Sequence, residues 1–215
     1  MDSTISPSKN AKLFFKKYRK LQNTIAIVGK QKELAEIELQ YLDSIIYEIN
    51  TATCIDDIDN IYSEICDNLL YKGKNINTVN NHLNNQNKSK KLNKENANNM
   101  PAKYLIDGYT VLVGKNNKQN DYLTCKLAQN SDIWFHTKDI HGSHVVLKLD
   151  NSKTDVPDSV LYKCAALAAY FSKARISQNV PVDYTFIKNV KKPNGAKPGM
   201  VIYTNNKTLY VNPHN

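Results

Sequence analysis

A heptad pattern of apolar residues near the N-terminus limits the possible folds more than any other feature of this sequence. Its positions, which alternate four and three residues apart, are Phe14, Tyr18, Leu21, Ile25, Val28, Lys32, Ala35, Leu39, Leu42, Ile46 and Ile49. This spacing predicts a helix with one coiled-coil face. Ser6 and Pro7 suit the start of that helix, and no proline interrupts it afterwards. At 1.5 Å per residue the helix would be roughly 60 Å long.

The heptad spacing resumes after a break at residues 50–53. The second run consists of Ile55, Ile58, Tyr62, Ile65 and Leu69. The simplest structure is an antiparallel coiled-coil hairpin over residues 1–71, with its tip near residue 51. The second helix is too short to cover the N-terminal half of the first. We therefore expect another partner to cover that half, either a second copy through self-association of the coil or a protein segment outside this sequence. A plain dimerisation coil is the alternative.

Residues 72–102 separate the predicted hairpin from the rest of the chain. They are poor in apolar residues and rich in asparagine, with 11 asparagines between Asn75 and Asn99. Such a segment buries too little apolar surface to offset the conformational entropy that ordering costs. This composition predicts a disordered linker.

The pattern over residues 103–215 predicts an α+β fold built on an antiparallel sheet. The predicted strands are residues 104–106, 109–113, 133–136, 145–148, 182–187, 200–204 and 209–211. The last two are expected to pair as a hairpin around Asn205–Asn206. The main predicted helix is Ser159–Ala174, and a short helix, Tyr122–Ala128, follows the polar loop Gly114–Asn120.

One stretch of this domain, residues 131–150 (SDIWFHTKDIHGSHVVLKLD), concentrates unusual side chains. It holds the only tryptophan, Trp134, and three of the five histidines. Alternation along a strand places Asp132, Trp134 and His136 on one face. Two interpretations stay open for that face. It could be a surface that binds a ligand, or a core in which Trp134 packs with His136 hydrogen-bonded beneath it.

The charge indicates a polyanionic partner. The net charge is +9, and residues 103–215 hold 15 Lys/Arg against 8 Asp/Glu, a balance of +7. Nucleic acid is the first candidate for such a domain. Lysines in predicted loops can meet phosphates, namely Lys115, Lys118, Lys188, Lys191, Lys192 and Lys197. Trp134, His136 and His144 can stack on bases. The loop amides, ahead of a helix, could hold a phosphate.

Other chemistries have weaker support. His136, His141 and His144 have no neighbouring cysteine and no acid at a standard zinc-ligand spacing. Ser143 precedes His144 directly, which does not establish the geometry of a nucleophile and its base. We therefore expect no catalytic site, metal or cofactor. The four cysteines form no C-x-x-C pair, and no run of 18 apolar residues or secretory signal is present. These features predict a cytoplasmic protein that does not span a membrane.

Six segments of the domain together resemble a known family. They are VGKNNKQNDYLTCKLA, DIWFHTK, GSHVV, AAYFSKAR, VPVDYT and VKKPNGAKPGMVIY. In this order they are similar to the NFACT-R domain, the C-terminal RNA-binding domain of bacterial ribosome quality control factors of the RqcH family, long called fibronectin-binding protein A. The segment SPSKNAKLFFKKYRKL resembles the start of that family's middle coiled coil.

The resemblance carries implications for residues and for function. The family's D-x-W-x-H and P-G-S-H motifs fall on Asp132, Trp134, His136, Gly142, Ser143 and His144. His141 takes the place of the motif's proline. Full-length members bind large ribosomal subunits that carry stalled peptidyl-tRNA, recruit alanyl-tRNA and add alanine tails. The family's NFACT-N and helix-hairpin-helix domains are not in the sequence, so we expect a C-terminal fragment or a split product.

The sequence therefore predicts an RNA- or ribosome-binding module that is not an enzyme by itself. Its expected partners are the large ribosomal subunit, through rRNA and ribosomal protein, and tRNA. The predicted RNA-binding residues are Lys115, Asn116, Asn117, Asn120, Asp132, Trp134, His136, Gly142, Ser143, His144, Lys188, Lys191, Lys192 and Lys197. The Trp134 face and the 188–197 loop are expected to form one surface. The alternatives are a fibronectin-binding surface adhesin and a histidine-dependent nucleic-acid-processing enzyme.

Overall fold

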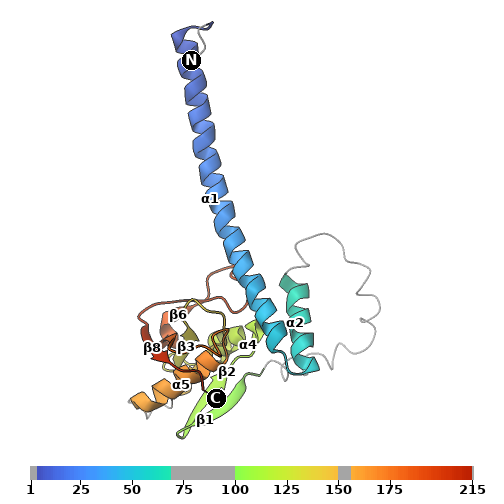
Figure 1. The fold of residues 1–215 in the computed structure, drawn as a ribbon, viewed down its shortest axis with the longest axis vertical. Helices are drawn as coiled ribbons and strands as arrows, with labels where there is room; N and C mark the ends of the chain where they lie inside the picture. The colour runs from blue at the N-terminus through green and yellow to red at the C-terminus, as the bar shows by residue number, and fades with distance from the viewer. Residues whose placement is uncertain (1–3, 69–99, 150–155, 215) are drawn as a thin grey trace, which may run out of the picture. The chain divides into compact units, whose positions relative to one another are not determined.

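The computed structural model describes residues 4–68, 100–149 and 156–214. They belong to two units, Met1–Asp43 and Ser44–Asn215, which are described separately (Figure 1). Nearly all of the predicted linker lies outside the described residues, and its disorder stays a prediction.

The first unit consists mainly of a long helix. This helix, α1 (Pro7–Thr51), has 45 residues and continues into the second unit. Ser6 caps it as predicted, because the Ser6 hydroxyl accepts a hydrogen bond from the main-chain N–H of Lys9 at 3.4 Å. The predicted heptad residues of this unit are largely exposed, among them Phe14, Tyr18, Leu21, Ile25, Val28 and Leu39. No segment among the described residues covers that apolar face.

The second unit begins with the end of α1 and a second helix, α2 (Ile55–Asn68). The break between them confirms the predicted interruption near residue 51. The predicted coiled-coil contact between the two helices is wrong, because its heptad positions are exposed. They include Ile46, Ile49, Ile55, Ile58 and Tyr62. The buried residues of these turns are instead Ile45, Glu48, Ile61 and Glu64. The buried face carries the carboxyl groups of Glu48 and Glu64, which accept hydrogen bonds from Asn117, as described below.

The domain predicted to be α+β has that fold. All six strands of its main sheet pair antiparallel, in the order β1-β2-β4-β3-β5-β8. Their bounds are β1 (Ala102–Ile106), β2 (Tyr109–Val113), β3 (Ile133–Thr137), β4 (Val145–Leu147), β5 (Val180–Phe186) and β8 (Lys207–Val211). The strands β6 (Val190–Lys191) and β7 (Ile202–Tyr203) form a separate small sheet. The predicted hairpin around residues 205–206 is therefore wrong, because its two strands pair in different sheets.

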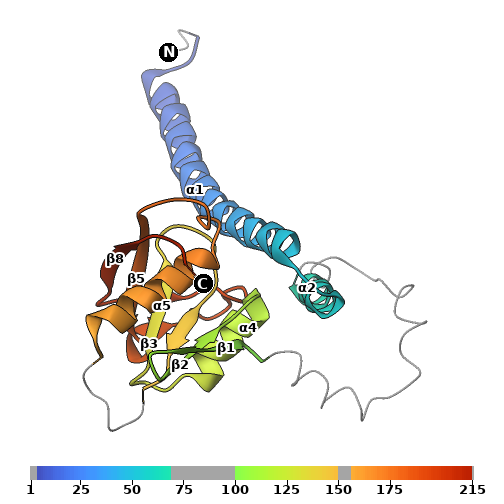
Figure 2. The same ribbon diagram turned by 60° about the horizontal axis from the view of Figure 1, so that its bottom comes forward.

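The helices of this domain differ from the predictions mainly at their ends. The main helix, α5 (Asp158–Tyr170), lies across the strands (Figure 2). The short helix α4 (Asn117–Tyr122) starts earlier than predicted and continues as a π-helical turn, Leu123–Leu127. Its cap is Asn116, whose side chain accepts a hydrogen bond from the main-chain N–H of Gln119 at 2.8 Å.

Two hydrophobic clusters lie on opposite faces of the sheet. One contains Phe135 and packs against α5. The other contains Trp134 together with Leu123, Val146 and Ile187. Neighbouring residues of β3 enter different clusters because side chains alternate along a strand. The face that carries the sequence motif is thus covered by α4, the π-helical turn and the small sheet.

Candidate nucleic-acid interface

Trp134 lies in a closed aromatic cluster. Its ring stacks on His136 at 5.6 Å between centroids and meets the edge of His144 at 5.2 Å. Tyr203 packs against it at 4.9 Å. Trp134 is fully buried, so its faces are occupied by protein. The predicted stacking of this ring on a base is therefore wrong for this conformation, and the core interpretation that the sequence left open is correct.

The two histidines of this cluster are uncharged at neutral pH. Burial lowers the pKa of His136 to about 4, although hydrogen bonds with backbone groups of Gly142 and Thr137 act to raise it. Burial also holds the pKa of His144 well below its ordinary value. Nδ1 of His144 lies 2.7 Å from the Thr124 hydroxyl oxygen. These imidazoles therefore serve packing and offer no positive charge to a phosphate.

Asp132 also has a structural position. Its carboxylate accepts hydrogen bonds from the main-chain N–H groups of Gln129 at 2.7 Å and of Leu149 at 2.9 Å. It also forms an ion pair with Lys148. This fully buried carboxylate ties the turn before β3 to the end of β4, and its oxygens face protein donors.

The amides of the 115–120 loop bind protein groups. The Asn120 carbonyl oxygen Oδ1 accepts a hydrogen bond from the main-chain N–H of His144 at 2.9 Å. Asn117 donates from its main-chain N–H to Glu48 at 2.5 Å, and from Nδ2 to Ser44 at 2.9 Å and Glu64 at 3.2 Å. The predicted phosphate loop is thus a joint that connects α4 to α1 and α2.

The carboxyl groups at this joint are buried close together. Burial, followed by the neighbouring charge of Glu64, raises the pKa of Glu48 to about 9, although the hydrogen bond from Asn117 opposes the shift. Glu48 is therefore protonated at neutral pH. Its second oxygen, Oε2, is buried and has no hydrogen-bond partner among the described residues. Such an atom costs about 1–3 kcal/mol in lost hydrogen bonding with water.

The predicted lysines divide into two groups. Three of them bind protein: Lys118 pairs with Asp67, Lys192 pairs with Asp121, and Lys197 donates to the Asn68 carbonyl oxygen. The other three, Lys115, Lys188 and Lys191, are exposed. Because Trp134 is buried, the predicted single surface of Trp134 and the 188–197 loop is not present in this conformation.

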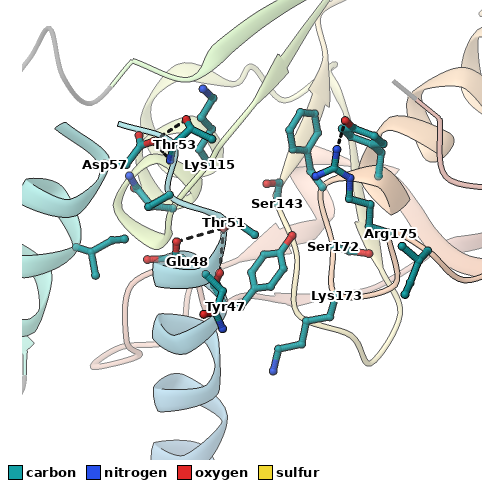
Figure 3. A pocket seen from close by; sticks show the side chains of 17 residues that line it. Tyr47, Glu48, Thr51, Thr53, Asp57, Lys115, Ser143, Ser172, Lys173 and Arg175 are labelled. Carbon is teal, nitrogen blue, oxygen red and sulfur yellow. Dashed lines mark hydrogen bonds between the residues drawn. The ribbon is translucent and has the colours of Figure 1, made fainter. Parts of the chain in front are cut away.

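A cavity of about 580 Å³ lies elsewhere in the second unit (Figure 3). Its walls come from the end of α1, the start of α2 and its connection, the 115–116 loop, residue 143 and the segment 170–176. The predicted residues that line it are Lys115, Asn116 and Ser143. Lining residues that the sequence did not single out include Tyr47, Glu48, Lys173 and Arg175. The last two belong to AAYFSKAR, one of the six segments that resemble the family.

Gly142 allows two of the cavity walls, its own segment and the 170–176 segment, to approach each other closely. It forms an isolated bridge with Ser172, and the main-chain N–H of Ser143 donates to the Phe171 carbonyl oxygen at 2.9 Å. A Cβ atom on Gly142 would lie 2.8 Å from the Cβ of Ser172 and 3.1 Å from the Phe171 carbonyl oxygen. Only a residue without a side chain allows this approach. The glycine of the motif therefore positions Ser143 at the cavity.

The cavity carries a positive balance. Lys115, Lys173 and Arg175 contribute cations, and Asp57 is the lining residue that contributes a negative charge, because Glu48 is protonated. The Arg175 guanidinium lies over the Tyr170 ring, 4.0 Å from its centroid, and donates a hydrogen bond to the Tyr170 hydroxyl. An anion would be stabilised here.

The described part of the chain lacks two other features. No three His, Cys, Asp or Glu side chains converge there as they would around a metal ion. No helix in those residues is long and apolar enough to cross a membrane.

Comparisons with known proteins agree with this fold. Residues 103–205 match the model of the NFACT protein RNA binding domain, and residues 1–83 match that of the NFACT N-terminal and middle domains. The chain is 42% identical over 208 residues to the "Rqc2 homolog RqcH" of Bacillus subtilis, covering 97% of this chain and 34% of that protein. It is 40% identical over 215 residues to the protein of the same name in Streptococcus suis, covering 99% of this chain and 35% of that protein.

A solved structure gives the same result. It is described as the C-terminal of the fibronectin/fibrinogen-binding protein from Streptococcus suis, and it matches with a TM-score of 0.78 and 38% identity over 96% of this chain and 77% of that one. The chain spans about a third of the length of the curated relatives it matches. With this agreement in sequence and in fold, the chain belongs to the NFACT family and carries that family's RNA-binding domain.

Proposed function

We propose that this chain is the RNA-binding module of a ribosome quality control factor. In this proposal it binds obstructed large ribosomal subunits that carry peptidyl-tRNA, and it supports alanine tailing of the stalled nascent chain. The observation that carries the proposal is the match of residues 103–205 to the NFACT RNA-binding domain. The proposed partners are rRNA, ribosomal protein and tRNA, and the proposed location is the cytoplasm, where ribosomes work.

The distribution of exposed cations supports a contact with RNA. Lys115, Lys173 and Arg175 lie at the cavity, and Lys188 and Lys191 are exposed near the small sheet. Cations that are not already neutralised by protein carboxylates release counterions when they meet phosphates, which makes binding favourable and sensitive to salt. The residues that bind RNA are thus proposed to be these exposed cations, and the buried aromatic cluster is proposed to support the surface from below.

Sedimentation with purified large ribosomal subunits carrying peptidyl-tRNA tests this function. We expect the chain to co-sediment at low salt and to stay in the supernatant at raised salt. Empty large subunits are the control for the peptidyl-tRNA requirement. Absence of the chain from the subunit fraction at low salt would contradict the proposal.

The solved relative is described as a fibronectin/fibrinogen-binding protein, which makes fibronectin a second candidate partner. A pull-down with immobilised fibronectin, with and without nuclease, separates the two. Binding that survives nuclease would favour the adhesin, whereas binding that nuclease abolishes would reflect RNA bridging. The histidine-dependent enzyme gains no support, because the His136 and His144 rings pack against Trp134 and against each other.

A further inference from the structure

We infer that the cavity of the second unit binds one unpaired RNA nucleotide. Its base would lie against Tyr47, and its flanking phosphates would meet Lys115 on one side and Lys173 and Arg175 on the other. The inference rests on the proposed RNA-binding function and adds to it a defined site and a substrate class.

The size of the cavity suits one nucleotide. Its volume is about 580 Å³, and sites for small molecules usually measure roughly 300–1,000 Å³. Its walls come from both sides, with Tyr47 and Glu48 on α1 and Ser143, Ser172 and Lys173 on the facing segments (Figure 3). A paired base cannot enter such a space, because its partner strand would collide with the walls. The cavity therefore selects an unpaired base.

An aromatic ring is available for stacking. Tyr47 is half-buried and extends from the last turns of α1 towards Ser143 and Ser172 (Figure 3). Among the described residues no aromatic ring packs on it, in contrast to Trp134, whose faces are covered. Stacking on an aromatic ring is the usual way in which proteins hold single-stranded bases without strict sequence preference.

The cations lie where the neighbouring phosphates would emerge. Figure 3 shows Lys115 on one side of the cavity and Lys173 and Arg175 on the other. Arg175 is already oriented, because it lies over the Tyr170 ring and donates to the Tyr170 hydroxyl. An ordered guanidinium loses less side-chain entropy when it binds a phosphate. A nucleotide inside an RNA chain has a phosphate on each side, which this arrangement matches.

Two buried polar atoms of the lining have no hydrogen-bond partner among the described residues. They are Nδ2 of Asn116 and Oε2 of Glu48, and both residues are at least nine-tenths buried, with 4% and 5% exposure. An amide N–H and a carboxyl group are the groups that bind the edge of a base. Because both residues line the cavity and these two atoms have no protein partner among the described residues, they point to a ligand.

The experiment measures fluorescence anisotropy of the whole chain with a labelled single-stranded RNA of ten nucleotides, with the same RNA as a duplex, and with adenosine monophosphate as competitor. Tyr47→Ala should lower the affinity for single-stranded RNA about tenfold through lost stacking, whereas Tyr47→Phe should keep it. The double variant Lys173→Ala/Arg175→Ala should weaken binding and its salt dependence. Lys207→Ala, which removes an exposed lysine from β8 outside the cavity, is the matched control.

Crosslinking gives a second readout that does not depend on folding of a variant. RNA that contains 4-thiouridine should crosslink to peptides with residues 44–51 or 170–176. Crosslinks confined to other peptides, equal affinity of Tyr47→Ala and wild type, or equal binding of duplex and single strand would each overturn the inference. Competition by the mononucleotide as strong as that by the RNA would show a small-molecule site and would overturn it too.

The proposed function can be judged separately. If wild type co-sediments with large subunits while Tyr47→Ala binds single-stranded RNA normally, the cavity inference is wrong and the ribosomal function stands. If wild type binds single-stranded RNA in the cavity but never sediments with subunits, the ribosomal function is wrong and the site stands as an RNA site.

Discussion

The main-chain N–H of Asn117 donates a hydrogen bond of 2.5 Å to the Glu48 carboxyl group, and this bond joins α4 to the last turns of α1. The Asn117 side chain completes the joint by donating to Ser44 and Glu64. One residue thus satisfies groups on both helices. The joint also brings two carboxyl groups into a buried space, which makes its stability depend on a proton.

Replacing Glu48 by glutamine should remove this dependence on pH. The pKa of Glu48 rises from the ordinary 4.5 to about 9 in the folded chain. Below pH 4.5 the group is protonated in both states, and between these values only the folded state holds the proton. The wild type should therefore lose stability as pH rises towards 9, by up to about 1.4 kcal/mol per pH unit, relative to Glu48→Gln.

Urea unfolding between pH 6 and 9 measures this difference. Glu38→Gln is the control, because Glu38 is an exposed residue of the same helix. Parallel stability curves for wild type and Glu48→Gln would show that the carboxyl pair holds no extra proton.

Trp134 should affect stability far more than RNA affinity. Trp134→Ala removes a fully buried ring and should cost about 3–5 kcal/mol of unfolding free energy. Trp134→Phe keeps part of the packing and should fold, and its affinity for single-stranded RNA should equal that of wild type. Equilibrium unfolding and anisotropy check the two statements. A folded Trp134→Phe variant that no longer binds RNA would restore the stacking role that the sequence suggested.

Lys115 and Lys118 offer a matched pair of lysines three residues apart. Lys115 is exposed at the cavity, whereas Lys118 forms an ion pair with Asp67 and a hydrogen bond with Ser63. Lys115→Ala should reduce the slope of log affinity against log salt by about 0.7, the value for one phosphate contact with a single strand. Lys118→Ala should change it less. Salt titrations of RNA binding measure both slopes, and the reverse order would place the contact on the α2 side.

Gly142→Ala should damage both the fold and the cavity. The added methyl group would lie 2.8 Å from the Cβ of Ser172, and relief of such overpacking costs about 1–3 kcal/mol. Gly29→Ala is the opposite control, because no atom lies within 4 Å of its added Cβ and alanine favours a helix by about 1 kcal/mol. In thermal unfolding, Gly142→Ala should lower the melting temperature and Gly29→Ala should raise it. If Gly142→Ala did not lower the melting temperature, segment 170–176 would be able to move away from Gly142.

The predictions from sequence succeeded where local periodicity determines structure. The heptad run without proline is sufficient for α1, and alternation places Trp134 and His136 side by side on one face of β3. Alternation cannot tell which face is covered, however. Trp134 is buried because Leu123 and Tyr203, from segments on either side of it in the chain, fold over that face. The buried face of α1 escaped prediction for a similar reason, because Asn117, 69 residues after Glu48, supplies its polar partner.

The cavity could not be derived from local patterns at all. Tyr47, Lys115 and Arg175 come from three separate parts of the chain, and each looks like an ordinary surface residue in its own segment. Their convergence depends on the close approach at Gly142 and on the joint at Asn117. The family motif singled out Gly142 and Ser143, but it did not indicate which segments of the chain approach each other at these residues.

The burial of Trp134 gives the protein an internal optical probe. The sequence has a single tryptophan, so the indole emission of the whole chain comes from the covered side of the second unit's sheet. Enclosed by Leu123, His136, His144 and Tyr203, this indole should emit at short wavelength and shift to the red when the second unit unfolds. The same emission does not report on the part of α1 that lies in the first unit. Unfolding of that part would have to be measured by circular dichroism.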